Sequence, residues 1–336
     1  MSDDRSRIRL RKPVRRYGAG MLRDLAAIAR LPNVPTVWSN VLAGHLVGLG
    51  LARVALDGTK VRPDFAWGTA LAAAGAATFL YLMGTFLNDA VDVAVDRVHR
   101  PERAVAAGRL SAAFVCNLGL LWGMLGVACA FPLGPFPLAL AGVVAVCVLL
   151  YTWSHKKWAA SVLLIGLCRG LLYPLGAFAG IGLIGGDLRP VAWWACALGV
   201  LQAAYVAGLS LAARSEASGG PSPRVRRWAI FLLTLPFLAP TGYLLWLPGT
   251  LGQPDRWDVF LLGWAFASVA GLGWVWHTCV GFQRSTGTFV TRALAGVALV
   301  DVLPVLWLGA GSPWTALLPM ACFALALCLQ RLAPAT

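Results

Sequence analysis

A row of oxygen-bearing side chains follows the second long apolar stretch of the chain. Asn88, Asp92 and Asp96 are four residues apart, a spacing that places all three on one face of a helix. Like charges at this spacing destabilise a helix, so the two carboxylates need a compensating cation. Oxygen ligands suit a hard divalent ion such as Mg²⁺, which usually shares its coordination shell with water and substrate phosphates. The pattern therefore predicts a Mg²⁺ site held by these three residues.

Three arginines, Arg100, Arg103 and Arg109, come directly after the carboxylates. Guanidinium groups bind phosphate oxygens in a fork geometry, so carboxylates followed by arginines fit a Mg²⁺–diphosphate complex better than a metal ion alone. The alternative is that Asp92 and Asp96 merely pair with Arg100 and Arg103 on a solvated loop. The helical register, the apolar stretch before it and the lack of other acidic clusters in the sequence favour the binding site.

The chain as a whole has too few charged residues to cover the surface of a soluble protein. Of its 336 residues, 59% are hydrophobic and 12% are charged, whereas a soluble protein has about 25% charged residues. This composition excludes a soluble enzyme, a disordered regulator and a secreted disulfide scaffold, and it indicates a membrane protein. In such a protein the net charge of +14 reports orientation and contact with anionic lipid rather than binding to nucleic acid.

Ten stretches are long and apolar enough to cross a bilayer, which takes about 20 residues. They are Val34–Leu51, Ala66–Asn88, Ser111–Phe131, Pro135–Trp153, Ala159–Leu183, Val191–Arg214, Trp228–Leu247, Trp257–Cys279, Thr288–Gly309 and Pro313–Gln330. With the N-terminus in the cytoplasm, 22 Lys and Arg residues fall inside and five outside, as the positive-inside rule expects.

We therefore predict an all-α, polytopic transmembrane bundle of nine to ten spans in the inner cell membrane. Residues 1–33 are expected to form a basic cytoplasmic arm, and residues 34–336 a single transmembrane domain whose motif loops face the cytoplasm.

The acidic row and the residues after it resemble a known motif. Asn88, Asp92 and Asp96, with Arg100–Arg103 and Gly108–Ser111, are similar to the first aspartate-rich motif of the UbiA superfamily of membrane prenyltransferases. The stretch from Arg30 to Thr36, with Asn40 and Gly44 downstream, also resembles the first helix of that family, and the resemblance covers roughly residues 25–220. It implies a helical bundle around a central cavity with a cytoplasmic cap. It also implies that Asn88, Asp92 and Asp96 hold Mg²⁺ and that Arg103 binds the diphosphate, with Arg100, Arg109 and Asn40 as further candidates.

Two segments depart from the family pattern. Where the family has a Tyr followed four residues later by a Lys, this chain has Tyr151, then His155 in the place of that lysine, and Lys156 one position later. We expect Lys156 to reach the diphosphate beside Tyr151 and to act in catalysis with Asp92 and Asp96. The second acidic motif is reduced to Glu216, which we expect to bind metal while Arg214 replaces a cation on the diphosphate. The alternative is that, with one carboxylate there, catalysis is weak or absent. This combination resembles the EboC-like branch of the superfamily.

The resemblance implies Mg²⁺-dependent transfer of a prenyl group from an allylic prenyl diphosphate to an unidentified aromatic or lipidic acceptor within the lipid bilayer. The alternative is a non-catalytic membrane carrier or assembly component that retains a cavity for prenyl diphosphate or lipid. No nucleic-acid partner is expected, and the sequence gives no oligomeric state.

Two charged residues lie deep within predicted spans. Arg169 and Asp301 are functional candidates because charge at that depth is costly. They either hold the bundle together by pairing with each other or with carbonyl groups, or form a polar wall of the cavity.

Overall fold

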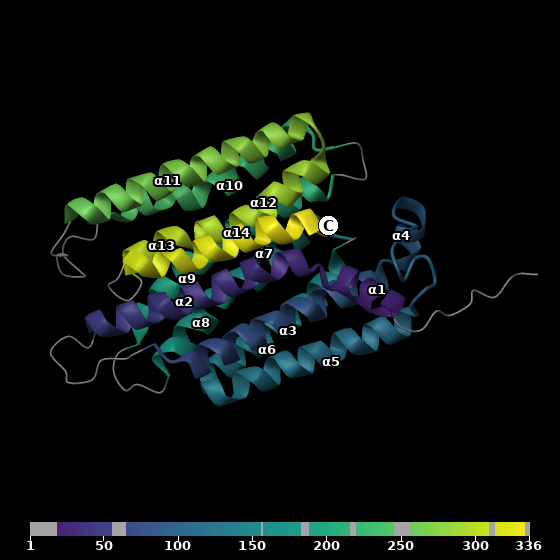
Figure 1. The fold of residues 1–336 in the computed structure, drawn as a ribbon, viewed down its shortest axis with the longest axis horizontal. Coiled ribbons are helices and arrows are strands. Elements are labelled where there is room, and N and C mark those ends of the chain that lie inside the picture. Colours follow the sequence, from purple (N-terminus) through teal and green to yellow (C-terminus); the bar gives the residue numbers. More distant parts are fainter. Residues whose placement is uncertain are drawn as a thin grey trace, which may run out of the picture.

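The described part of the chain is an elongated bundle of helices. A computed structural model describes residues 19–55, 65–155, 157–182, 188–215, 220–244, 257–308 and 313–332. Figure 1 shows the long helices running side by side along the longest axis, with α1 and α4 together at one end. The α-helices are α1 (Ala19–Ala29), α2 (Val34–Ala55), α3 (Trp67–Val91), α4 (Val93–His99), α5 (Ala112–Ala130), α6 (Pro135–Ser154), α7 (Ser161–Gly170), α8 (Leu172–Ile181), α9 (Arg189–Ala213), α10 (Pro223–Leu244), α11 (Trp257–Val280), α12 (Thr286–Val300), α13 (Val302–Leu308) and α14 (Leu317–Leu332).

The predicted all-helical membrane bundle is confirmed. Eight helical segments of the described residues are long and apolar enough to cross a membrane: Gly20–Arg53, Trp67–Val91, Ala112–Leu133, Pro135–Ser154, Ser161–Ile181, Arg189–Ala213, Thr286–Leu306 and Trp314–Leu332. The other two predicted spans coincide with α10 and α11, which are not among these eight. The prediction of ten spans is therefore supported for eight of them.

Burial separates central from peripheral helices. The apolar window of Gly20–Arg53 is 83% buried within the protein, whereas that of Trp314–Leu332 is 22% buried. The first segment, with α2, therefore lies in the centre of the bundle, and α14 presents most of its surface outward. Helix α1 lies within the predicted N-terminal arm and packs its Ile28 and Ala29 against Phe86 and Val105.

Three of the eight apolar segments, Gly20–Arg53, Ser161–Ile181 and Thr286–Leu306, contain breaks. Arg30 has a φ of 46° between α1 and a 3-10 turn, Leu171 separates α7 from α8, and Asp301 separates α12 from α13. The expected tight connection between the third and fourth spans is a 3-10 turn, Phe131–Leu133. It ends at Gly134, whose φ of 102° is one that glycine adopts readily. The breaks matter because polar side chains lie beside them.

Helices α2 and α8 cross so closely that only glycine fits at the contact. A Cβ atom on Gly44 would lie 2.3 Å from the carbonyl oxygen of Tyr173, and one on Gly176 would lie 2.0 Å from that of Val41. Small residues at such crossings let two helix backbones approach. This crossing fixes the position of Tyr173 and of the α2 residues around it.

We predict that Gly44→Ala lowers the free energy of unfolding by about 1–3 kcal/mol, because the added methyl group must push α8 away. Thermal unfolding of the purified protein in detergent measures the effect. Gly142→Ala in α6 is the matched control, since nothing lies within 4 Å of its added Cβ. An unchanged melting temperature for Gly44→Ala would contradict the close crossing.

Candidate functional site

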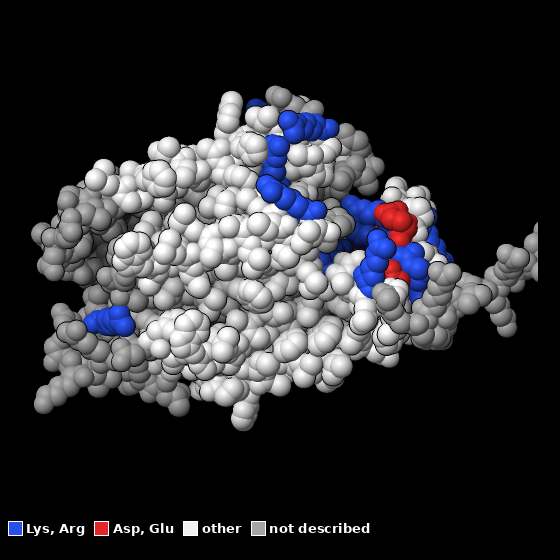
Figure 2. All heavy atoms as spheres, in the orientation of Figure 1, with Lys and Arg blue, Asp and Glu red and all other residues white. Residues whose placement is uncertain are grey.

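A cavity of about 700 Å³ lies inside the bundle. Its walls come from α2, α3, α6, α7, α9 and α12, and they are mostly apolar, as Leu80, Val148, Ile165 and Val297 illustrate. One end is polar and is formed by Asn88, Asp92, Asp96, Arg100, Arg103, Tyr151, His155 and Arg214. We call this group the polar end. Figure 2 shows acidic and basic side chains gathered at the same end of the molecule, near α1 and α4.

The acidic row lines the cavity across the junction of two helices. Helix α3 ends at Val91, Asp92 is the junction residue, and α4 begins at Val93. The amide of Asp92 nonetheless donates to the carbonyl of Asn88 at 2.9 Å, and the amide of Asp96 donates to the carbonyl of Asp92 at 2.8 Å. Because this helical hydrogen-bond spacing continues through the junction, all three side chains reach the cavity.

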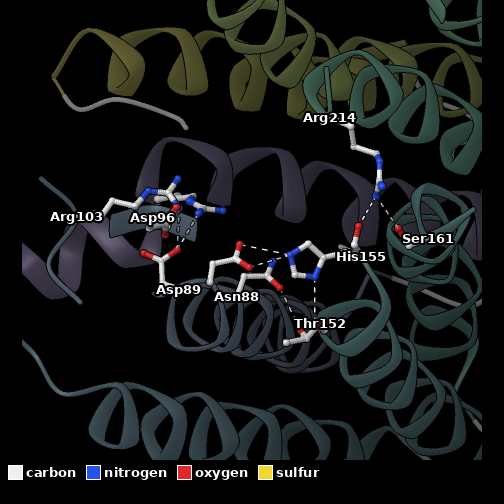
Figure 3. A network of polar contacts seen from close by, with 10 residues as sticks. Asn88, Asp89, Asp96, Arg103, Thr152, His155, Ser161 and Arg214 are labelled. Carbon is white, nitrogen blue, oxygen red and sulfur yellow. Dashed lines mark hydrogen bonds and ion pairs between the residues drawn. The ribbon is translucent and has the colours of Figure 1, made fainter. Parts of the chain in front are cut away.

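Basic and hydroxyl groups of the protein partner the acidic row. Figure 3 shows His155 directed at the row from the end of α6 and Arg103 directed at Asp96. The Nε2 atom of His155 lies 3.1 Å from a carboxylate oxygen of Asp92, and Arg103 donates to Asp96 at 3.0 Å. Thr152 donates to the amide oxygen of Asn88 at 3.2 Å. Each member of the acidic row therefore has a side-chain partner within the protein. The alternative interpretation placed such pairing on a solvated loop, but Asp96 and Arg103 pair in the cavity wall.

Two further residues, Asp89 and Arg30, belong to this network and were missed by sequence reasoning. Asp89 pairs with Arg30 at 2.9 Å and lies 3.5 Å from Arg103. Arg30 lines the cavity, and its carbonyl oxygen accepts a hydrogen bond from Tyr81. Asp89 is off the face shared by Asn88, Asp92 and Asp96, so the register argument excludes it. Only the packing of the α1–α2 junction beside α3 brings Arg30 to it.

Arg214 and Tyr151 reach the polar end from other helices. Arg214, at the end of α9, donates to the carbonyl of His155 and, at 3.0 Å, to the hydroxyl of Ser161. The ring of Tyr151 stacks on that of His155 with 5.2 Å between centroids. Arg100 also lines the cavity. Among the predicted diphosphate ligands, Arg100, Arg103, Tyr151 and Arg214 thus lie together.

The structure does not bring two other predicted ligands to the polar end. Asn40 is fully buried, does not line the cavity, and bonds Asp301 and Arg169. Arg109 pairs on the surface with Asp24 of α1 at 2.9 Å, and this hydrogen bond raises the pKa of Arg109. Each of these side chains has a nearer partner, which sequence spacing does not reveal. Lys156 and Glu216 lie outside the described residues.

The donor set fits a hard divalent cation. Asn88, Asp92 and Asp96 provide an amide and two carboxylates along one wall, and oxygen ligands of this kind suit Mg²⁺. Among the described residues, no group of three or more His, Cys, Asp or Glu side chains is arranged around a common point. A Mg²⁺ ion here would therefore complete its shell with water and substrate oxygens, as this ion usually does.

The fold and the site define a multi-pass membrane protein with a polar-ended apolar cavity. The chain belongs to the UbiA prenyltransferase family, which it matches over residues 46–285. A digeranylgeranylglyceryl phosphate synthase of Ignicoccus hospitalis is 33% identical over 139 residues, which are 41% of this chain and 41% of that protein. The chain spans about two-fifths of the length of the curated relatives it matches.

Two solved structures share the fold. One, from a study of digeranylgeranylglyceryl phosphate synthase in membranes, has a TM-score of 0.56 and 17% identity and covers 87% of this chain and 99% of its own. The other, a UbiA homologue from Archaeoglobus fulgidus bound to GPP and Mg²⁺, has a TM-score of 0.54 and 14% identity and covers 90% and 99%. At these identities the likeness establishes the fold alone.

We predict that Asp89→Asn lowers the free energy of unfolding by about 1–3 kcal/mol, because Arg30 and Arg103 lose their shared counter-charge at a mostly buried position. Thermal unfolding in detergent measures this. Asp24→Asn is the matched control: it removes the partner of Arg109, whose side chain is 48% exposed, and should cost less than about 1 kcal/mol. Equal melting shifts for the two variants would show that the Asp89 network is no stronger than a surface pair.

Proposed function

We propose that this chain transfers a prenyl group from a Mg²⁺-bound allylic prenyl diphosphate to an acceptor within the membrane. The observation that carries the proposal is the polar end, where the acidic row and three arginines meet at one end of an otherwise apolar cavity. A diphosphate is strongly anionic and a prenyl chain is strongly apolar, so a substrate that joins the two matches both parts of the cavity. The solved homologue bound to GPP and Mg²⁺ supports the same assignment.

In this proposal Asn88, Asp92 and Asp96 hold the metal ion, which would offset the negative charge that develops on the leaving diphosphate. Arg103 and Arg214 bind diphosphate oxygens, since guanidinium groups form strong charge-assisted hydrogen bonds with phosphate. His155 is a positioning residue that orients the Asp92 carboxylate. The apolar walls exclude water from the allylic cation that forms when the C–O bond breaks.

We further propose that the polar end faces the cytoplasm. Charge is clustered at that end (Figure 2), and in the predicted layout most basic residues lie on the same side of the membrane as the N-terminus. Both observations support this orientation. The division into a basic arm and one transmembrane domain, the resemblance to the EboC-like branch, and the expectation of reduced activity stay predictions. The last of these depends on the segment around Glu216, outside the described residues.

We predict that Asp92→Asn reduces the release of diphosphate from GPP by about a hundredfold or more, the order expected when a group that stabilises transition-state charge is lost. The assay uses purified protein in lipid nanodiscs, with a membrane extract added to supply the unidentified acceptor. Glu102→Gln is the matched control, because Glu102 is an exposed acid of the same segment that does not line the cavity. Full turnover by Asp92→Asn would overturn the proposal.

Removal of the divalent ion gives a second prediction. EDTA should abolish diphosphate release and weaken GPP binding, and added Mg²⁺ should restore both, because the carboxylates and the diphosphate repel each other without a cation between them. Calorimetric titration of GPP with and without Mg²⁺ measures the binding. Mg²⁺-dependent binding without any release of diphosphate would favour the alternative function, a carrier that retains the cavity.

A further inference from the structure

A further arginine, Arg169, lies in the cavity wall away from the polar end. Arg169 occupies the last turn of α7 and lines the cavity. It lies eight residues after Ser161, the α7 residue that bonds Arg214 at the polar end. At 1.5 Å per residue, this places Arg169 about 12 Å further along the helix. The surrounding wall is apolar, with Ile165 and Leu172 on either side of it in sequence. The proposed function assigns Arg169 no role.

Neutral groups hold the guanidinium of Arg169 in place. One terminal nitrogen donates to the amide oxygen of Asn40 at 3.1 Å, and the other donates to the hydroxyl of Thr36 at 3.1 Å. The carbon of the guanidinium lies 5.8 Å from the centre of the Tyr81 ring. Arginine has five N–H donors, and within the described residues only these two hydrogen bonds engage them. The side chain is oriented, but most of its donors have no acceptor there.

The nearest candidate counter-charge, Asp301, is occupied elsewhere. Its carboxylate is fully buried and accepts hydrogen bonds from the hydroxyls of Ser39 and Tyr173. The amide nitrogen of Asn40 donates to both carboxylate oxygens, at 2.8 and 3.1 Å. Asn40 therefore stands between Asp301 and Arg169, and in the described residues no carboxylate is within ion-pair distance of Arg169. The direct pairing that the sequence allows does not occur. Asp301 is thus linked to Arg169 through Asn40 and does not pair with the guanidinium directly.

We propose that Arg169 binds an anionic oxygen group, a carboxylate or a phosphate, of the acceptor substrate. A buried guanidinium with unused N–H donors favours an anionic partner, because apolar walls offer neither a counter-charge nor hydrogen-bond acceptors. The planar fork of arginine matches carboxylate and phosphate oxygens. This inference rests on the proposed function: the prenyl diphosphate occupies the polar end, and the acceptor lies between the two with its anionic group on Arg169.

The test measures binding of small matched probes to purified protein in nanodiscs by calorimetry. Phenyl phosphate and benzoate are the anionic probes, and phenol and benzyl alcohol are their neutral counterparts. Each titration is run with Mg²⁺ and a GPP analogue that carries sulfur at the bridging position, which fills the polar end without turnover, and is repeated without them. We expect the protein to bind at least one anion about tenfold or more tighter than its neutral counterpart. Which anion is preferred identifies carboxylate or phosphate.

Two variants separate Arg169 from other arginines. Arg169→Met keeps the length of the side chain without its charge, and it should remove the preference for the anion while GPP binding persists. Arg109→Met changes an arginine outside the cavity and should leave the preference intact. A purely structural role for Arg169 would lower the melting temperature of Arg169→Met without changing the ratio of anion to neutral affinities. Should Arg169→Met fail to fold, Arg169→Lys decides, because loss of the planar fork should reduce the preference severalfold.

The inference is overturned when the protein shows no preference for either anion, or when the preference persists unchanged in the Arg169 variants. Failure of the proposed function is a separate result, seen as absent Mg²⁺-dependent GPP binding or as diphosphate release that survives Asp92→Asn. Anion binding at Arg169 is measured without turnover, so either result stands without the other.

Discussion

The polar end of this protein depends on pairing between the carboxylates at the end of α3 and in α4 and two arginines and a histidine from three other segments. Asp89 joins Arg30 to Arg103, Asp96 accepts from Arg103, and Asp92 faces His155 at the end of α6. In a bundle surrounded by lipid, a carboxylate without a partner is costly. The same pairing therefore closes the helices around the cavity and keeps both acids and bases at one end, available to a metal ion and a diphosphate.

Buried polar groups lie at or beside the breaks in the long helices. Asp301 lies where α12 passes into α13, and Arg169 lies two residues before the break between α7 and α8. The close crossing of α2 and α8 at Gly44 and Gly176 brings Asn40 and Tyr173 to Asp301. Glycine at that crossing is thus a requirement for the polar network as well as for packing, because a wider spacing would separate the carboxylate from its donors.

The sequence predicted what depends on local spacing. The helical fold follows from apolar length, and the shared face of Asn88, Asp92 and Asp96 follows from a repeat of four residues. What depends on contacts between distant segments was not predictable: Arg30 and Asp89 are 59 residues apart, and neither belongs to a repeating pattern. Asn40 was assigned to the diphosphate by resemblance alone, but its amide bridges Arg169 and Asp301, and that arrangement appears only when α2, α7 and the α12–α13 break are packed together.

The separation of the two cationic regions constrains how substrates are held. A diphosphate and a second anion in one apolar cavity repel each other strongly unless each has its own counter-charge, because the effective dielectric constant is low there. Arg100, Arg103 and Arg214 lie at the polar end. Arg169 lies about 12 Å along α7 from Ser161, the residue that bonds Arg214. Asp301 does not line the cavity and contacts Asn40 rather than Arg169, so it does not compete with a bound anion for direct contact with the guanidinium. The acid that orients Arg169 through Asn40 is therefore one whose oxygens already accept hydrogen bonds from Ser39, Asn40 and Tyr173.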